Sequence, residues 1–380
     1  MSKVYFWGAI GVKGVQSDEP ALLAGGKKSS VTSLKPLLAA AEIVQVSAGG
    51  SFCAMLDLEG NVYSFGKGAD HRLGLGDERD HFESPAKIPQ LKASIVSAGY
   101  SHGMALLKDC KNKVVLWGKL SPQLTFMKPT EKVVELQDDD DQIVSLRSGN
   151  GYSAVITKKG HVFMIGRNSF YKCGFAENAD LDSFKQLVIN DNGNKYDTFK
   201  DIDLGYDSTL AITATGEVFG FGSNNCYQLG IGKVIKVGGH VPTRLTFSSP
   251  INPVQVACSR GSGHHCHGVV LDADGVLHSF GSGYKYKLGT TTTDDQPVPV
   301  KVDFDIKVKQ VIPGGIHNFS LTVDNELVSF GCGSDGRLGH EESKNYRYLY
   351  KETEPRKIEG LGNKVVQADS DYYFGIAIVK

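Results

Sequence analysis

The sequence predicts an all-β fold, a seven-bladed propeller of four-stranded antiparallel blades, and three observations support this prediction. A unit of three short strands recurs along the 380 residues at a mean spacing of about 54 residues. The strand segments are rich in β-branched and aromatic residues, and turn residues separate them. Glycine makes up 45 of the 380 residues, which suits blades that each need several tight turns of positive φ.

Residues 43–76 are the clearest copy of the unit. Its strands are expected at residues 43–46, 52–56 and 62–65. A glycine pair ends the first strand, a single glycine ends the third, and a Leu-Gly pair closes the unit. The glycine after the third strand recurs seven times, at Gly8, Gly66, Gly118, Gly166, Gly222, Gly281 and Gly331.

The other two corners recur as well. The first corner returns at residues 47–50, 97–100, 147–150, 203–206, 260–265, 313–316 and, without its glycine, 368–371. The Leu-Gly corner returns at residues 73–74, 229–230, 288–289 and 338–339, with Cys173-Gly174 as a degenerate copy. This pattern resembles the regulator of chromosome condensation repeat over nearly the whole chain. The resemblance implies a seven-bladed propeller, but a fold does not fix a function.

The two ends of the chain are expected to complete one blade together. The strand at residues 3–7 corresponds to the third strand of a unit, but the two strands that precede the third strand in other units are missing before it. Matching strands occur at residues 365–368 and 374–379. Strands from both termini would therefore close the ring and remove its free edges.

Composition indicates a single propeller domain over residues 1–380, which could be a module of a longer multidomain signalling protein. The net charge is −1 and the pI is near 6.8, so nucleic acid is not an expected partner. Neither a signal peptide nor a membrane-spanning run is visible. The seven cysteines show no pairing framework, which favours free thiols and a cytoplasmic rather than nuclear location. A monomer is expected.

Several local motifs were weighed for chemistry. Residues 331–336 match G-x-G-x-x-G, and residues 26–29 resemble the end of a phosphate loop. The first is a blade corner rather than the start of a helix, and the second lacks its upstream glycine, so no cofactor is predicted. His265 and His267 could share a strand face and bind a metal, although filling the usual histidine position of the repeat is the favoured reading. No catalytic residue and no metal ligand are predicted.

Three irregular segments have open roles. The acidic run from Asp138 to Asp141 reads as a solvated loop, with contact to a basic partner or a cation as the alternative. Residues 177–198 read as a long polar surface connection. Residues 341–356, rich in tyrosine and charge, read as an outer loop or short helix, or as a partner-binding element.

The first corners should all emerge on one face of a propeller, around the central channel. In the Ran exchange factor, the best-known member of the family that this chain resembles, that face contacts the GTPase through acidic and histidine side chains. The resemblance places His102, His267 and His317 at the histidine position. The full set of candidate partner-binding residues is Tyr100, His102, Tyr152, Tyr206, Asp207, His265, His267, His317, Asp371 and Tyr373. The tyrosines are included because tyrosine is favoured as an interface anchor.

The chain departs from that exchange factor at several positions. Tyr100 and Gly151 replace acidic residues, and Tyr373 replaces a histidine. Residues 119–131 lack the glycine-rich hairpin that would act as a wedge, and residues 177–198 lack the arginines of nucleosome-binding members. We therefore expect a non-enzymatic interaction module in small-GTPase signalling, with a protein partner or other domains of the same polypeptide on the loop face. A guanine-nucleotide exchange factor for a Ran-like GTPase is the alternative.

Overall fold

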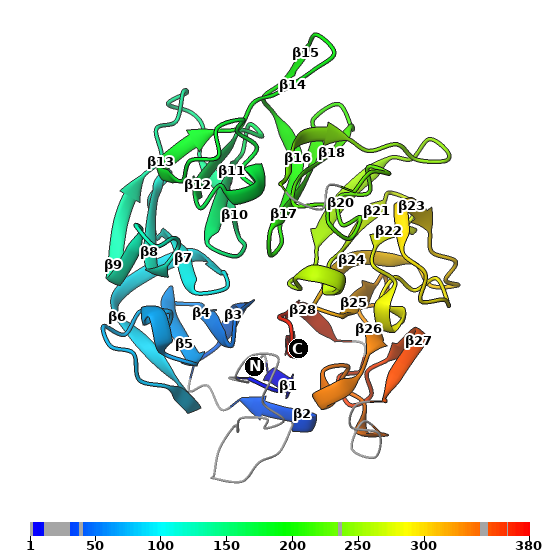
Figure 1. Cartoon of the computed structure of the whole chain (residues 1–380). Coiled ribbons are helices and arrows are strands. Elements are labelled where there is room, and N and C mark those ends of the chain that lie inside the picture. The colour runs from blue at the N-terminus through cyan, green and yellow to red at the C-terminus, as the bar shows by residue number, and fades with distance from the viewer. Residues whose placement is uncertain (1–2, 11–30, 38–40, 235–237, 343–348, 363) are drawn as a thin grey trace.

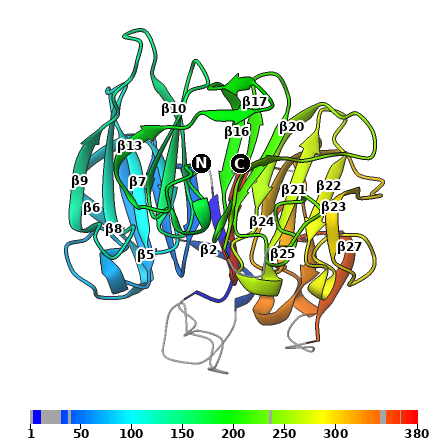
Figure 2. The same cartoon turned by 45° about the horizontal axis from the view of Figure 1, so that its top comes forward.

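The computed structural model describes residues 3–10, 31–37, 41–234, 238–342, 349–362 and 364–380. In this part of the chain, the sheets follow one another in sequence order around a ring, as Figures 1 and 2 show. The helical elements described are single 3-10 turns, η1 (Ala69–His71), η2 (Ser169–Tyr171), η3 (Gly263–His265), η4 (Tyr284–Tyr286) and η5 (Ser334–Gly336). None of the described helices has the length and apolar character needed to cross a bilayer. The predicted β-propeller class is confirmed.

Five sheets have four antiparallel strands each. One joins the chain ends, in the order β2 (Val31–Leu37), β1 (Lys3–Gly8), β29 (Phe374–Val379) and β28 (Val365–Ser370). The second contains β10 (Ile143–Ser148), β11 (Tyr152–Thr157), β12 (Val162–Gly166) and β13 (Leu181–Gln186). The third contains β16 (Phe199–Leu204), β17 (Ser208–Thr213), β18 (Val218–Gly222) and β19 (His240–Arg244). The last two contain β20 (Pro253–Cys258), β21 (His267–Asp272), β22 (Leu277–Gly281) and β23 (Gln296–Lys301), and then β24 (Val308–Pro313), β25 (His317–Thr322), β26 (Leu327–Cys332) and β27 (Lys351–Lys357).

The second and third sequence units form one continuous seven-stranded sheet. Its strands are β3 (Ile43–Gly49), β4 (Phe52–Asp57), β5 (Asn61–Gly66), β6 (His81–Ala98), β7 (His102–Leu107), β8 (Lys113–Lys119) and β9 (Thr125–Val133). β6 has 18 residues; its first part pairs with β5 and its last part with β7. The prediction of seven separate four-stranded blades is therefore wrong, because five sheets are separate four-stranded blades and these two units share one strand.

The predicted closure of the ring by both termini is confirmed. β1 pairs antiparallel with β29 from Lys3 opposite Val379 to Gly8 opposite Phe374, and β29 pairs in turn with β28. Trp7 is completely buried and donates a hydrogen bond from Nε1 to the carbonyl of Arg337, 3.0 Å away, in the preceding sheet. The first strand of the chain thus fills the core between the first and last repeats.

The glycine after each third strand allows two segments to approach closely. Gly66 has a φ of +119°, and a Cβ built there would lie 2.5 Å from the carbonyl oxygen of Ser51. Gly8 has a φ of +91°, and a Cβ built there would lie 2.3 Å from the carbonyl oxygen of Tyr373. A larger residue would push the first corner away from the third strand, which explains why the sequence repeat keeps glycine at this position.

The irregular segments contain strands that the sequence analysis did not predict, although residues 177–198 lie mostly at the surface as expected. Residues 177–198 include the outer strand β13 and a hairpin, β14 (Ile189–Asp191) with β15 (Asn194–Tyr196), that projects from the ring in Figure 1. Residues 349–356 lead into the outer strand β27 rather than a helix, and residues 343–348 lie outside the described part. Residues 26–29, which resemble the end of a phosphate loop, lie outside it as well.

The acidic run from Asp138 to Asp141 is held in place by contacts with its own chain. Asp138 forms an ion pair with Lys159, and Lys111 donates to the carbonyl of Asp139. Asp141 is buried and accepts from the main-chain N–H groups of Gln142 and Lys159. These contacts favour a structural turn, and the described residues contain no group of three or more His, Cys, Asp and Glu that could hold a metal ion.

Candidate functional site

The candidate site is the face on which the first corners surround one end of the channel, here called the loop face. The corners lie between β3 and β4, β6 and β7, β10 and β11, β16 and β17, β20 and β21, β24 and β25, and β28 and β29. Main-chain hydrogen bonds link neighbouring corners: Gly50 donates to Gly99, Tyr100 to Gly149, and Asn150 to Gly205. The corners therefore form a continuous rim rather than independent loops.

Four buried cations support this rim from beneath, and each directly precedes a Leu-Gly or Cys-Gly corner. Arg72 donates to the carbonyl of Gly50 at 2.6 Å, and Arg337 donates to that of Tyr372 at 3.1 Å. Lys172 donates to the carbonyl of Asn150 at 2.8 Å, and Lys287 to that of His264 at 3.0 Å. Every residue has a main-chain carbonyl that can accept a hydrogen bond, whatever its side chain. The buried cations can therefore hold the corners in place while the side chains on the outer surface of the corners vary.

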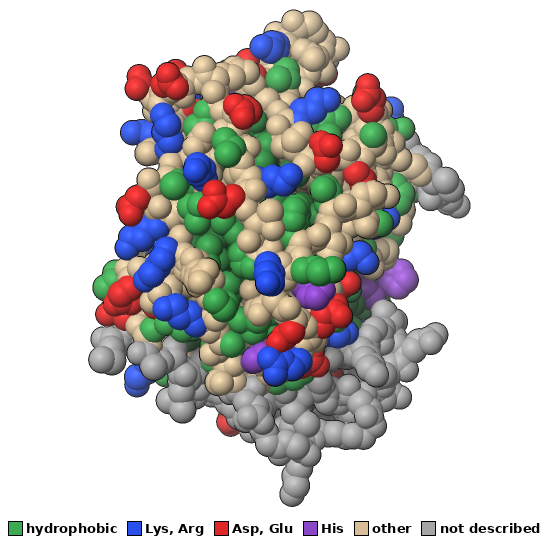
Figure 3. All heavy atoms as spheres, turned by 90° about the vertical axis from the view of Figure 1, so that its left-hand side faces the viewer, with side chains coloured by type: hydrophobic (Ala, Val, Ile, Leu, Met, Phe, Trp, Pro, Cys, Tyr) green, Lys and Arg blue, Asp and Glu red, His purple; other side chains and the backbone are tan. Residues whose placement is uncertain are grey.

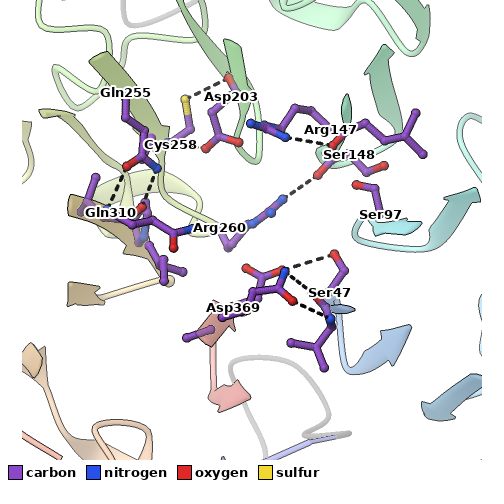
Figure 4. Close-up of a pocket in the computed structure, with 18 of the residues that line it drawn as sticks. Ser47, Ser97, Arg147, Ser148, Asp203, Gln255, Cys258, Arg260, Gln310 and Asp369 are labelled. Atoms are coloured by element: carbon purple, nitrogen blue, oxygen red, sulfur yellow. Dashed lines mark hydrogen bonds between the residues drawn. The ribbon is translucent and has the colours of Figure 1, made fainter. Parts of the chain in front are cut away.

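The axis of the propeller is crossed by Arg260, which follows β20. Its Nη1 donates to the carbonyl of Ser148 at 2.6 Å and lies 3.3 Å from that of Leu204, in the two preceding sheets. Figure 4 shows Arg260 extending toward Ser148, between Asp203 and Asp369. This side chain lines both the channel and a small pocket at the loop face.

Side chains of the inner strands connect each sheet to the next across the channel wall. The Gln45 amide donates to the carbonyl of Val96 and accepts from its N–H, at 3.0 and 2.9 Å. Gln367 makes the same pair of bonds with Val46, and Gln255 makes it with Val311. The channel cavity has a volume of about 180 Å³ and also contains the Arg147–Asp201 ion pair, at 3.2 Å. Its polar groups mainly join the sheets.

Four of the predicted partner-binding residues are buried between sheets. His102 Nε2 lies 2.7 Å from Ser153 Oγ, His267 Nε2 lies 3.1 Å from Asn318 Oδ1, and His317 Nε2 lies 2.9 Å from Ser370 Oγ. Tyr152 donates its hydroxyl to the carbonyl of Ser208 at 2.8 Å. All four are at most 1% exposed, so they join neighbouring blades and do not reach a docked partner.

Burial also suppresses the charge of these histidines. Desolvation lowers the pKa of His102 and of His267 to about 3, and it lowers the pKa of His317 well below its usual value. Among the described residues, Nδ1 of each ring has no hydrogen-bond partner. A protonated ring would therefore carry a buried N–H without an acceptor. The histidine position of the repeat is accordingly a neutral structural position in this chain.

The other predicted residues lie at or near the surface of the loop face. Tyr100 is 44% exposed, and its ring meets that of Tyr206 edge-on at 5.5 Å. Tyr373 lies with its ring 5.0 Å from the Arg337 guanidinium. Asp207 is partly exposed and pairs with Lys172 at 2.8 Å. These residues come from separate corners and share one face.

Asp371 and His265 lie at the edges of the same region. Asp371 is 5% exposed, accepts from the Ser51 N–H at 3.3 Å, and lines the axial pocket with Tyr100 and Tyr206. Burial raises its pKa to about 6. His265 Nδ1 lies 2.7 Å from the Tyr372 hydroxyl, whereas His267 faces Asn318. The two histidines therefore point to different partners and do not form the metal-binding pair considered from the sequence.

The residues that sequence reasoning missed are Arg72, Lys172, Lys287, Arg337 and Arg260. The sequence did contain a signal for the first four, because a basic residue directly precedes the Leu-Gly or Cys-Gly pair in four of the five corners that have such a pair. Arg260 had no such signal, because it occurs in one corner only. Its role depends on the position of the channel axis.

The comparisons with known proteins agree with this architecture. The family model described as the RCC1-like domain matches residues 3–377. The chain belongs to the RCC1-like domain family. It is 28% identical over 318 residues to the Regulator of chromosome condensation of Homo sapiens, covering 78% of this chain and 74% of that protein. It is also 24% identical over 385 residues to the E3 ubiquitin-protein ligase HERC2 of Homo sapiens, covering 96% of this chain and 7% of the ligase.

Solved structures support the fold of this RCC1-like propeller. Prp20p of Saccharomyces cerevisiae, studied for its binding properties to Gsp1p and histones, is 20% identical with a TM-score of 0.77. That match covers 100% of this chain and 91% of the yeast chain. Human WBSCR16 is 20% identical with a TM-score of 0.74, covering 100% and 99% of the two chains. At this identity the likeness concerns the fold alone.

Proposed function

We propose that this RCC1-like propeller is a non-enzymatic interaction module that binds a protein partner on its loop face and acts in small-GTPase regulation. The observation that carries the proposal is the tyrosine cluster at the channel mouth, with Tyr100 and Tyr206 in edge-on contact above a buried carboxylate, Asp371. Tyrosine presents a large, rigid contact area at low entropic cost and is enriched at binding hot spots. The rim beneath it is fixed by buried cations, so little ordering is required on binding.

Nucleotide exchange is the second candidate, favoured by the similarity to the Regulator of chromosome condensation. The segment predicted to lack a wedge forms a tight turn, in which Leu120 and Ser121 N–H groups face the Leu124 carbonyl, followed by the outer strand β9. This compact path supports docking over the displacement of a phosphate loop. The charged positions of a Ran-binding face are also occupied by Tyr100 and Gly151.

The proposal includes the cellular context. All seven cysteines are free, and five of them are buried, which supports a reducing compartment such as the cytoplasm. We propose that the propeller acts as a monomer, with a separate protein or with other domains of the same polypeptide. The likeness to a segment of the much longer HERC2 supports the second arrangement.

The test measures binding and nucleotide release for a panel of purified small GTPases. Tyr100→Ala with Tyr206→Ala should weaken the binding of a true partner by about tenfold or more. Leu58→Ala is the control, because Leu58 is 64% exposed in the turn between β4 and β5, at the other end of the sheet. A partner whose binding is unchanged in the tyrosine variant would contradict docking on the loop face. Accelerated release by the wild-type chain would instead favour the exchange function.

A further inference from the structure

One sector of the loop face differs from the others in charge. The corners that contain Arg72 and Arg337 each hold an aspartate two residues earlier, Asp70 and Asp335, which pairs with the arginine at 2.9 and 2.8 Å. In the corner that contains Lys287, the same position is Lys285. All three of these residues share a left-handed backbone, with φ of 60° or 61°. Lysine in place of aspartate therefore reverses the charge at this position, while the backbone conformation of the corner stays the same.

Lys287 lies at the centre of this sector. It is completely buried and donates to the carbonyls of His264 and Tyr284, at 3.0 and 3.3 Å. Within the described part of the chain, no ion pair joins Lys287 to a carboxylate, whereas Lys172 pairs with Asp207. Burial lowers the pKa of Lys287 to about 7. A buried ammonium without a bonded carboxylate is stabilised when a negative group approaches from outside.

The surface above Lys287 combines cations with aromatic rings. We define the basic aromatic patch as His264, Tyr284, Lys285, Tyr286 and Lys351. The Lys351 ammonium lies 4.2 Å from the Tyr286 ring centre, and the Lys285 ammonium lies 5.7 Å from that of Tyr284. Tyr284 is 41% exposed, and His264 and Lys351 are exposed as well. The attraction between each ammonium group and the ring face holds the two lysines in place, with Lys351 exposed and Lys285 partly exposed.

Two acidic residues lie close to the patch. Asp294 and Asp295 follow η4 on the connection to β23, and Asp295 accepts the Gly283 N–H at 2.9 Å. By contrast, the side of the molecule shown in Figure 3 has lysine, arginine, aspartate and glutamate interspersed. With lysine at the position where the equivalent corners hold aspartate, this sector is more positive than those corners, which favours a partner with the opposite charge.

We propose that the basic aromatic patch binds an acidic segment of the protein partner, one whose aspartate or glutamate carboxylates meet Lys285 and Lys351. The proposal deepens the proposed function, on which it rests, by assigning the charge of the partner. Carboxylates would accept from the two ammonium groups, and the aromatic rings would cover the apolar stems of the acidic side chains. The charges are thus opposite to those of an exchange-factor face, where acidic residues of the propeller attract a basic GTPase surface.

The test uses a fluorescein-labelled peptide of eight glutamates, with binding followed by fluorescence anisotropy at low and physiological salt. Wild-type protein should bind the peptide, more weakly at higher salt. Lys285→Asp with Lys351→Glu should weaken binding by about tenfold. Lys285→Asp restores the aspartate found at the equivalent corner position and would pair with Lys287, so the variant is expected to fold.

Lys67→Glu with Lys119→Glu is the matched control, because these two lysines follow third-strand glycines elsewhere on the loop face. It changes the net charge by the same amount and should leave binding close to wild type. The proposal is overturned if both double variants weaken binding equally, if wild-type protein does not bind the peptide, or if an oligothymidine of equal charge binds at least as tightly.

A partner identified in the GTPase panel separates this inference from the proposed function. If its binding is lost in the Tyr100 and Tyr206 variant but survives in the Lys285 and Lys351 variant, the loop face is the docking surface and the acidic-segment proposal is wrong. If neither variant affects binding, docking on the loop face is wrong as well. Loss in both variants supports both proposals.

Discussion

At the scale of the residue, the buried histidines make stability depend on pH. His102 and His267 remain neutral in the folded protein to pH values near 3, whereas a histidine in the unfolded chain binds a proton below about pH 6.5. The unfolded state therefore holds more protons between these values, and the free energy of unfolding falls as the pH is lowered. Each such histidine contributes a slope of up to about 1.4 kcal/mol per pH unit.

Buried carboxyls act in the opposite direction over a narrower range. The pKa values of Asp201 and Asp371 are raised to about 6, so these groups gain protons in the folded state before they do in the unfolded chain. Their ionisation costs stability above pH 6, and part of that cost is recovered as the pH falls toward 4. Burial raises the pKa of Asp369 as well, so the carboxyls and the histidines oppose each other between about pH 6 and pH 4. Net destabilisation by the histidines is expected below about pH 4, where carboxyls of the unfolded chain are protonated too.

The first prediction uses His102→Gln, measured by urea unfolding at pH 7.5, 6 and 5. Glutamine removes one titrating group, so the free energy of unfolding of the variant should depend less steeply on pH than that of wild type. The gap between the two proteins should narrow as the pH falls. Parallel pH profiles would show that His102 does not carry this linkage.

The same residues show what the sequence could predict about the site. The repeat pattern located the histidine position at three corners correctly, but it gave no direction for the side chain. The structure turns each ring toward a Ser or Asn of the next blade. That direction depends on how neighbouring sheets stack, which is a property of the closed ring. Tyr100 and Tyr206 line the pocket at the loop face, whereas Tyr152, predicted on the same grounds, is buried, so the type of residue alone does not give its exposure. The binding role of the two tyrosines stays a prediction.

At the scale of the element, the short strands were predictable because each is a run of β-branched or aromatic residues that ends at glycine. The fusion of two units through β6 was not. The segment contains Pro85 and Pro89, which normally interrupt a strand, and Gln90 has a φ of +58°. Gln90 lies at a register shift within the pairing with β5, which continues to Lys92, and pairing with β7 begins at Ala93. Local propensity cannot anticipate such a continuous path.

The second prediction concerns the strand that closes the ring. Deleting residues 1–8 would remove β1, expose one edge of β29, and leave a cavity where the buried Phe6 and Trp7 pack. Loss of a buried tryptophan alone costs about 3–5 kcal/mol, so the free energy of unfolding should fall by at least that amount. Thermal unfolding by circular dichroism measures the effect. A melting temperature equal to that of the full chain would contradict closure by β1.

At the scale of the whole molecule, the third prediction concerns the thiols. Every cysteine is free, and burial raises the pKa of Cys53, Cys173, Cys258 and Cys266 well above its usual range, so the native protein should react slowly with iodoacetamide. In denaturant without reductant, intact mass spectrometry should show seven modified thiols. Two or more protected cysteines in protein from the reducing cytosol of an expression host would contradict this count.

The fourth prediction is that the propeller does not accelerate nucleotide release from Ran. Three features of one face support it: Tyr100 and Gly151 stand where acidic contacts are expected, and residues 119–131 form a turn and an outer strand. Losing two or three contacts of about 1–3 kcal/mol each would slow exchange by orders of magnitude. Release of a fluorescent guanine nucleotide at micromolar propeller measures this. A rate about a hundredfold above the intrinsic rate would establish exchange activity instead.

The strand shared by two units has a mechanical consequence. Where sheets are separate, a pull on one blade reaches its neighbour through side-chain contacts, a few main-chain hydrogen bonds between corners, and short linkers. Along β6 the same backbone is hydrogen-bonded on one side to β5 and further on to β7. Tension applied to β6 would act on the hydrogen-bond ladder with β5 and on the ladder with β7 together. We therefore expect these two units to unfold in a single step, whereas the other blades unfold one at a time. In an optical-trap experiment, the two units would appear as a single rupture of about double length.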